Sequence, residues 1–173
     1  MMHGRMKSKL LASALAAVLA PTAVVASYAV PLEARAAAVK EAKCQVHAVL
    51  ASKEGDTGIP DKLRFLEAQL KDDEFAAYKS FHLIEQKALT IKLDVISEVT
   101  LTTGNRLGLS LLGNDDTRLK LRTSLSSRDG SKSLLSTEYS MEDAGVLMIR
   151  AGSHTYEGIE GKLFIAIQCA RSG

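Results

Sequence analysis

The chain has 173 residues, of which 46% are hydrophobic and 24% charged, so it has enough apolar side chains to bury the core of one domain. Its 22 basic and 20 acidic side chains give a formal net charge of +2, but four of the basic residues and one acidic residue fall within residues 1–36. The remaining residues, 37–173, therefore carry 18 basic and 19 acidic side chains. This nearly neutral segment lacks the basic patch that phosphate backbones require, so we expect no nucleic-acid partner.

Residues 1–36 have the composition of a secretory signal peptide. Basic residues precede an apolar run over 10–30, and small residues surround Arg35. Cleavage after Ala36 and cleavage after Ala29 both meet the requirement for small residues at the cleavage site. The alternative is an uncleaved anchor, because an apolar run of this length can span a bilayer; Pro21 and the many small residues favour cleavage. We predict an exported protein, periplasmic or extracellular, with membrane contact only through an uncleaved signal.

The first predicted strand, about 43–52, places Cys44 on an apolar face. After a loop, Pro60 and Asp61 are residue types that favour the first turn of a helix. Leucines then recur at helical spacing, and three further apolar residues widen this stripe: Leu63, Leu66 and Leu70, with Phe65, Ala68 and Phe75. The pattern predicts one short helix over about 60–71, which a further turn can extend to Tyr78.

Beyond the helix, the apolar period changes from helical to two. Alternating runs begin near positions 81, 89, 99, 107, 119 and 135, and two more segments, about 146–152 and 162–169, follow. Turn-forming residues separate the runs, and Asp129-Gly130 is a strong hairpin signal. About nine short strands with short connections predict a mainly β fold, an antiparallel β-sandwich or barrel-like domain over 37–173. The last strand is apolar on both faces, so we expect it to be central or covered by the helix.

Cys44 and Cys169 are the two cysteines of the chain. An even number of cysteines in an exported protein favours a disulfide. Cys169 ends a run in which alternate residues are apolar, so both sulfur atoms are expected to point inward. We predict a structural Cys44–Cys169 disulfide, with two unpaired buried thiols as the alternative. A reactive thiol is disfavoured because neither cysteine has a neighbouring histidine motif.

The candidate site residues form no recognised motif. His47, His82 and His154 are too widely spaced for a metal pair, although His154 lies in a turn-rich stretch, 152–158, where loop residues often carry function. The segment around Ser110 lacks the second glycine of a nucleophile elbow. Acidic clusters offer calcium ligands only if their loops meet; they lie at 72–74, 115–116 and 142–143. We therefore predict no catalytic residues, no cofactor and no metal site.

One segment resembles a pattern found in small, uncharacterised secreted bacterial proteins. The resemblance covers residues 46–81 and rests on Val46–Ser52, Gly58-Ile59-Pro60, the leucines at 63, 66 and 70, and then Phe75, Tyr78, Lys79 and Phe81. It implies export and a place in a bacterial envelope, and it assigns no catalytic residue.

These observations predict an exported, non-enzymatic envelope protein that binds another envelope protein or acts as a structural subunit. A small-ligand or calcium-binding β-sandwich module is the alternative. A hydrolase with a dispersed active site is a third hypothesis, because catalytic groups meet in space and need not be adjacent in sequence.

Overall fold

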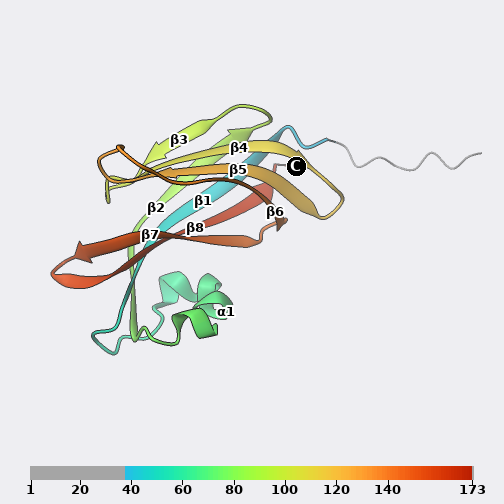
Figure 1. Ribbon diagram of the computed structural model, residues 1–173. Coiled ribbons are helices and arrows are strands. Elements are labelled where there is room, and N and C mark those ends of the chain that lie inside the picture. Colours follow the sequence, from blue (N-terminus) through green and yellow to red (C-terminus); the bar gives the residue numbers. More distant parts are fainter. Residues whose placement is uncertain (1–37, 173) are drawn as a thin grey trace, which may run out of the picture. The chain divides into compact units, whose positions relative to one another are not determined.

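Two antiparallel four-stranded sheets face each other in the computed structural model, which describes residues 38–172 (Figure 1). Sheet A has the strand order β2-β1-β8-β7, and sheet B has the order β3-β4-β5-β6. The strands are β1 (Glu41–Ser52), β2 (Ser80–Lys92), β3 (Ser97–Thr100), β4 (Arg106–Asn114), β5 (Arg118–Ser126), β6 (Ser133–Glu142), β7 (Val146–Tyr156) and β8 (Ile159–Arg171). The predicted mainly β, antiparallel sandwich is confirmed. The predicted signal, residues 1–36, and both candidate cleavage sites lie outside the described residues.

The described residues form eight strands instead of nine, because β2 joins two of the predicted strands into one strand of 13 residues. The register between β2 and β1 shifts at Ile84, which has no partner on β1 and so forms a β-bulge. The bulge reverses the face to which alternate side chains point. Phe81 and Leu83 pack beneath the helical segment, whereas Leu89 and Ile91 pack between the sheets. A continuous strand therefore shows an interrupted alternation in the sequence.

The last strand, β8, is central in sheet A and buried on both faces, as the sequence predicts. Leu163, Ile165 and Ile167 point into the core between the two sheets. Phe164 and Ala166 point to the opposite face and pack with the helical segment. The leucines of sheet B complete the inter-sheet core, and six of them have no exposed surface: Leu107, Leu109, Leu111, Leu119, Leu121 and Leu125. Burying each such side chain contributes about 1.5–3 kcal/mol.

A short helical segment covers the outer face of sheet A (Figure 1). It consists of a 3-10 helix, η1 (Asp61–Leu66), one α-helical turn, α1 (Glu67–Leu70), and a second 3-10 helix, η2 (Asp73–Phe75). The three predicted leucines and Phe75 are buried, but Phe65 and Ala68 are exposed, so the predicted stripe is too wide. A 3-10 helix has three residues per turn, so Leu63 and Leu66 share a face and Phe65 falls on another.

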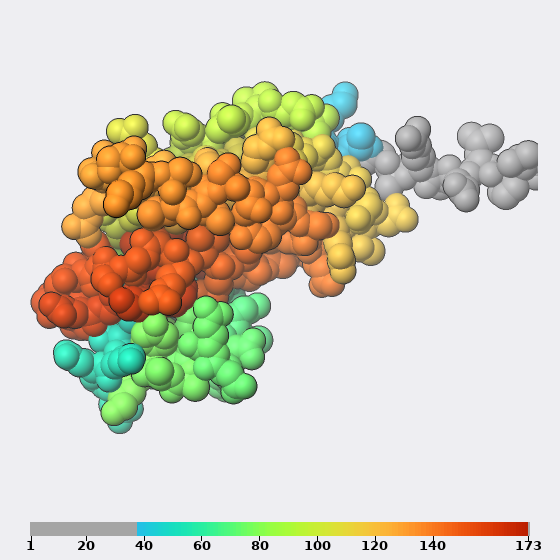
Figure 2. Space-filling model, in the orientation of Figure 1, coloured from blue at the N-terminus to red at the C-terminus, as the bar shows by residue number. Residues whose placement is uncertain are grey.

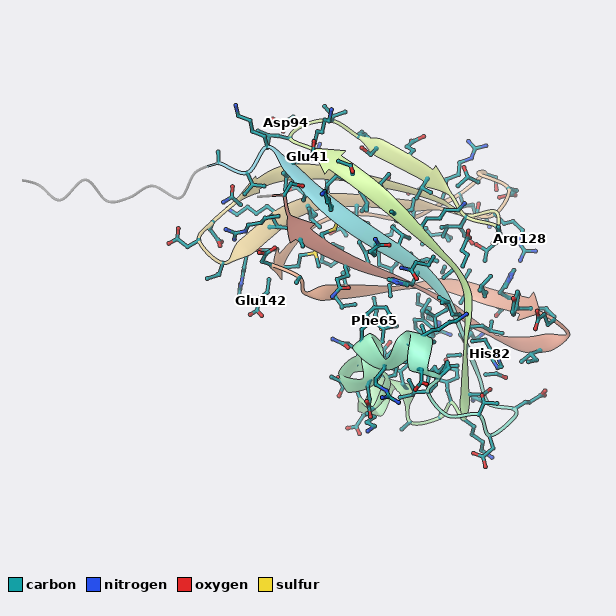
Figure 3. The ribbon with its side chains drawn as sticks, turned by 180° about the vertical axis from the view of Figure 1, so that it is seen from behind. Glu41, Phe65, His82, Asp94, Arg128 and Glu142 are labelled. Carbon is teal, nitrogen blue, oxygen red and sulfur yellow. A yellow bond between two sulfur atoms is a disulfide. The ribbon has the colours of Figure 1, made fainter. Side chains whose placement is uncertain are left out.

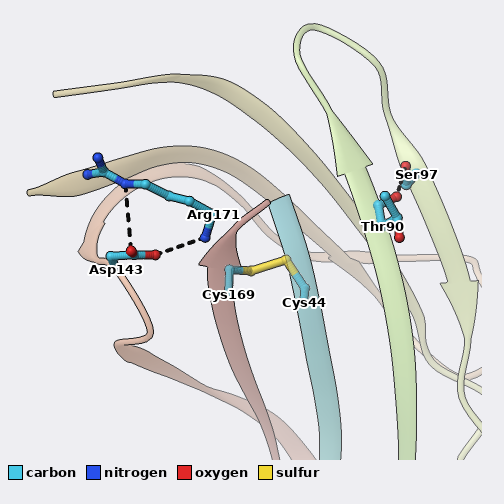
Figure 4. The surroundings of a disulfide bond; sticks show 6 residues. All are labelled: Cys44, Thr90, Ser97, Asp143, Cys169 and Arg171. Atoms are coloured by element: carbon cyan, nitrogen blue, oxygen red, sulfur yellow. Dashed lines mark hydrogen bonds and ion pairs between the residues drawn. A yellow bond between two sulfur atoms is a disulfide. The ribbon is translucent and has the colours of Figure 1, made fainter. Parts of the chain in front are cut away.

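The predicted disulfide joins Cys44 of β1 to Cys169 of β8, directly opposite each other in the ladder with their Cα atoms 4.0 Å apart (Figure 4). Both side chains lie in the core between the sheets, as predicted. The bond closes a loop with a sequence separation of 125 residues. Closing a loop of this length stabilises the folded state by roughly 4 to 5 kcal/mol through the entropy of the unfolded chain.

The two sheets come together along the side formed by β2 and β3. Ser97 of β3 donates a hydrogen bond to the carbonyl oxygen of Thr90 on β2 at 3.2 Å (Figure 4). The backbone N–H of Asp94, in the connection between these strands, donates to the carbonyl oxygen of Leu111 at 2.8 Å. These contacts join the sheets without merging their ladders, so the architecture is a sandwich and not a closed barrel.

Candidate functional site

A cleft with a volume of about 730 Å³ opens at the end of the sandwich away from the disulfide. From Cys44 to Ala51 the register of β1 against β8 advances seven residues, which is roughly 23 Å along the strand. Five chain segments line the cleft: the end of β1, the connection from η2 to β2, the β3–β4 loop, the β5–β6 turn and the β7–β8 hairpin. The cleft is lined by 51–54, Tyr78, 102–104, Arg128, 153–155 and 160–162.

Arg128 links the two sheets across this cleft. Its Nε–H donates to the carbonyl oxygen of Thr103 at 2.9 Å, within the loops of sheet B. Its terminal Nη2–H donates to Nδ1 of His154, which lies on β7 of sheet A. Figure 3 shows Arg128 beside the β7–β8 hairpin, and Figure 2 shows the orange β5–β6 region against the red hairpin. One side chain therefore joins the loops of sheet B to strand β7 of sheet A.

The β3–β4 loop is shaped to receive the arginine. A Cβ atom at Gly104 would lie 2.4 Å from Cγ of Arg128, and the φ angle of Gly104 is +89°, which side-chain-bearing residues rarely adopt. The neighbouring Thr103 and Asn105 are buried. Thr103 donates its hydroxyl to the Asn105 side chain at 3.0 Å, and Asn105 donates to the carbonyl oxygen of Ser126 at 3.0 Å. These buried hydrogen bonds hold the loop in place, and the aliphatic part of the Arg128 side chain packs over its glycine.

The opposite wall comes from β1 and β8. The buried Ser52 donates to the carbonyl oxygen of Glu160 at 2.7 Å and accepts from the backbone N–H of Glu54 at 3.1 Å. On the hairpin, the Lys162 ammonium donates to the hydroxyl of Ser153 at 2.7 Å. These bonds hold the backbone of the wall and leave charged side chains of both signs at its surface.

The charges of the cleft are largely unpaired. Three cationic residues line it, Lys53, Arg128 and Lys162, and within residues 38–172 none of them forms an ion pair with a carboxylate. Burial and, to a smaller extent, the charge of Arg128 lower the pKa of His154, which keeps its imidazole neutral at neutral pH. Because Nδ1 of this ring accepts from Arg128, its proton resides on Nε2.

The structure corrects the position of His154. The sequence places it in a loop over 152–158, but β7 extends to Tyr156 and the hairpin turn is confined to Glu157 and Gly158. The residue is half-buried and bonded to Arg128, not solvated in a loop. Gly152 and Gly158 together predict a longer turn than the chain forms. Gly152 does not belong to the turn but lies at a register irregularity between β7 and β8.

The other two histidines lie elsewhere and do not converge with it. His47 is 4% exposed on the helix-facing side of β1, with its ring centroid 4.5 Å from that of Phe65. Burial lowers the pKa of His47, a hydrogen bond with the Ala166 backbone partly opposes this, and Nδ1 has no hydrogen-bond partner among the described residues. His82 lies 3.3 Å from the hydroxyl of Ser80, measured from Nε2, in a separate hollow of about 220 Å³.

The acidic clusters at 115–116 and 142–143 meet at the disulfide end, where Asp115 and Asp143 accept hydrogen bonds from the protein. Asp115 accepts from the backbone N–H groups of Arg118 and Thr117 at 2.8 and 3.1 Å, and these bonds lower its pKa. Asp143 accepts from the backbone N–H of Arg171 at 2.9 Å and faces its guanidinium (Figure 4). Across residues 38–172, no group of three or more histidine, cysteine, aspartate or glutamate side chains is arranged to hold a metal ion.

The segment around Ser110 belongs to β4, and this serine is buried at 3% exposure, in agreement with its interpretation as a strand. Sequence reasoning did not find Arg128. The two turns that carry the cleft, at Gly104 and at Asp129-Gly130, are visible in the sequence, but nothing in it shows that they lie side by side.

The fold and the cleft define a disulfide-bonded antiparallel β-sandwich with a helical cover and a polar cleft at one end. No known family model matches the chain, and no curated protein matches it in sequence. In the part of the chain that is described, no helix is both long and apolar enough to cross a bilayer.

Proposed function

We propose that this chain is an exported, non-enzymatic envelope protein that acts as a protein-binding module and that the cleft is its binding site. The observation that carries the proposal is the contact of Arg128 with both Thr103 and His154, which fixes polar groups from two sheets around one opening. Loops on a rigid sandwich are common recognition sites. The disulfide between Cys44 and Cys169 supports an oxidising, exported location.

The histidine of the cleft supports a binding role over a catalytic one. A histidine that acts as general base on a neighbouring hydroxyl needs a ring nitrogen that is free to accept a proton. In His154, Nδ1 accepts a hydrogen bond from Arg128 and Nε2 carries the proton, so neither nitrogen is free. The hydroxyl of Ser153, the adjacent residue, accepts from the Lys162 ammonium instead. We therefore propose that these groups contact a bound partner and do not transfer protons.

The proposed partner is another envelope protein, and crosslinking in intact cells tests this. A photoreactive amino acid at Thr102 or Thr155, both exposed at the cleft, is expected to give one discrete adduct. The same amino acid at Glu98, an exposed position outside the cleft, is the matched control. Equal adducts from all three positions, or none from the cleft positions, would contradict the proposal.

A small soluble ligand is a second candidate, favoured by the size of the cleft. Its volume of about 730 Å³ lies within the roughly 300–1,000 Å³ that is usual for small-molecule sites. Tyr78 contributes an aromatic ring to the lining, and that ring also packs on Phe164 with centroids 6.1 Å apart. A ligand of this kind would raise the melting temperature of the purified protein, whereas an envelope protein partner would be recovered by crosslinking.

A further inference from the structure

We propose that the cleft recognises a carboxylate group and that the guanidinium of Arg128 is its principal contact. This inference rests on the proposed binding function and specifies the chemistry of what is bound. Of the five N–H donors of a guanidinium, two are used here, one on Thr103 and one on His154. Three N–H donors remain, and among residues 38–172 no carboxylate pairs with this arginine.

The guanidinium is held in place before any ligand arrives. Its stem lies over Gly104, where a Cβ atom would approach Cγ to 2.4 Å, and its Nε–H donates to the carbonyl oxygen of the buried Thr103. An arginine on an open surface loses side-chain entropy when it binds an anion. Arg128 is exposed as well, but its contacts with both sheets already confine it, so it loses less entropy on binding. Arg122, by contrast, already bonds a carboxylate of its own chain, Glu138, at 2.8 Å.

The neighbouring side chains select a singly charged group. Lys53 and Lys162, the latter bonded to Ser153 at 2.7 Å, add two further cations to the same cleft. Glu54 and Glu160 also line the cleft and would oppose a doubly charged phosphate more strongly than a carboxylate. The Nε2–H of His154 adds a neutral donor. This set fits a ligand with one carboxylate and further polar groups, either a free organic acid or the carboxylate of a peptide.

Paired probes that differ in one carboxylate test this in the purified, oxidised protein. Glucuronate with glucose represents the free acid, and N-acetylglycylglycine with its C-terminal amide represents the peptide. All four are titrated at one ionic strength, and the backbone amide signals of Thr103, Gly104 and Ser153 are followed by NMR. We expect saturable shifts with at least one acid, and we expect its neutral counterpart to bind with an affinity lower by about tenfold or more. The acid that binds identifies the source of the carboxylate.

Variants assign the effect to the arginine. Arg128→Gln is expected to weaken binding of the acid by about tenfold or more. Arg128→Lys keeps the charge but loses the planar guanidinium, so its affinity for the acid should lie between those of the unsubstituted protein and Arg128→Gln. Arg122→Gln removes an exposed arginine from the outer face of sheet B and should change affinity less than twofold. Thermal melts check that each variant is folded.

The outcomes separate this inference from the function on which it rests. Equal binding of an acid and its neutral counterpart, or acid binding that Arg128→Gln leaves unchanged, overturns carboxylate recognition but leaves a binding cleft. Absence of saturable shifts with all four probes overturns carboxylate recognition too, and the crosslinking at Thr102 and Thr155 then decides whether the cleft binds a partner by other chemistry.

Discussion

The side chain of Arg128 lies across the backbone of Gly104. A Cβ atom at position 104 would be only 2.4 Å from Cγ of the arginine. Gly104→Ala therefore introduces two penalties, the strain of a side chain at φ +89° and the collision with Arg128. We expect Gly104→Ala to lower the free energy of unfolding by about 1–3 kcal/mol in denaturant melts.

A double-mutant cycle separates the two penalties. In an Arg128→Ala background the Cγ atom is absent, so Gly104→Ala should be less destabilising by about 0.5 kcal/mol or more. Strictly additive effects of the two substitutions would contradict the packing described here and leave backbone strain as the whole penalty.

Cys44→Ala combined with Cys169→Ala is expected to lower the free energy of unfolding by about 2–5 kcal/mol, because the unfolded chain regains the freedom that the 125-residue link removes. Circular dichroism with urea measures the change. A reducing agent should lower the stability of the unsubstituted protein and leave that of the double variant unaltered. Because the bond lies roughly 23 Å from the cleft, the NMR signals of Thr103 and Gly104 should keep their positions.

The disulfide and the sheets follow from local patterns, whereas the cleft does not. Cys44 and Cys169 each lie on an apolar face with period two, so strand type and inward direction are predictable from short segments, and a total of two cysteines makes their pairing predictable. The contact of Arg128 with His154 joins residues from two different sheets. Which strand ends meet depends on the packing of whole sheets, and short-range periodicity carries no information about that.

The errors in the predicted elements also have local causes. Ile84 inserts one residue into β2, which reverses the alternation and divides one strand into two in the sequence pattern. Phe65 is assigned to the core by α-helical spacing, but the segment forms a 3-10 helix and leaves the ring 37% exposed, packed at its inner side against His47. Both errors arise where the backbone departs from the ideal period.

His47 should make the protein less stable in mild acid. Burial lowers the pKa of this imidazole in the folded state, so the unfolded state binds the proton more readily. Stability is therefore fully present above the unfolded pKa of about 6.5 and declines as the pH falls from that value toward the lower pKa of the folded state. Urea melts of the unsubstituted protein and His47→Gln between neutral and acidic pH measure this contribution.

His154 is the matched control for this prediction, since its pKa is lowered as well but its ring is half-buried. His47→Gln should remove more of the pH dependence of stability between neutral and mildly acidic pH than His154→Gln. An equal effect of the two substitutions would contradict burial as the cause of the lowered pKa of His47.

Phe164 is expected to be the residue on which the helical cover depends most. Its ring centroid lies 4.8 Å from that of Phe75, and its side chain is 3% exposed between sheet A and the helical segment. Phe164→Ala should lower the free energy of unfolding by about 3–5 kcal/mol, because removal of the ring leaves a cavity between β8, which carries Phe164, and η2. Phe65→Ala removes the same number of atoms from an exposed ring and should lower it by less than about 1 kcal/mol. Hydrogen exchange of the amides in 61–75 would accelerate in the first variant only, and similar exchange in both would mean that the cover is held by its leucines instead.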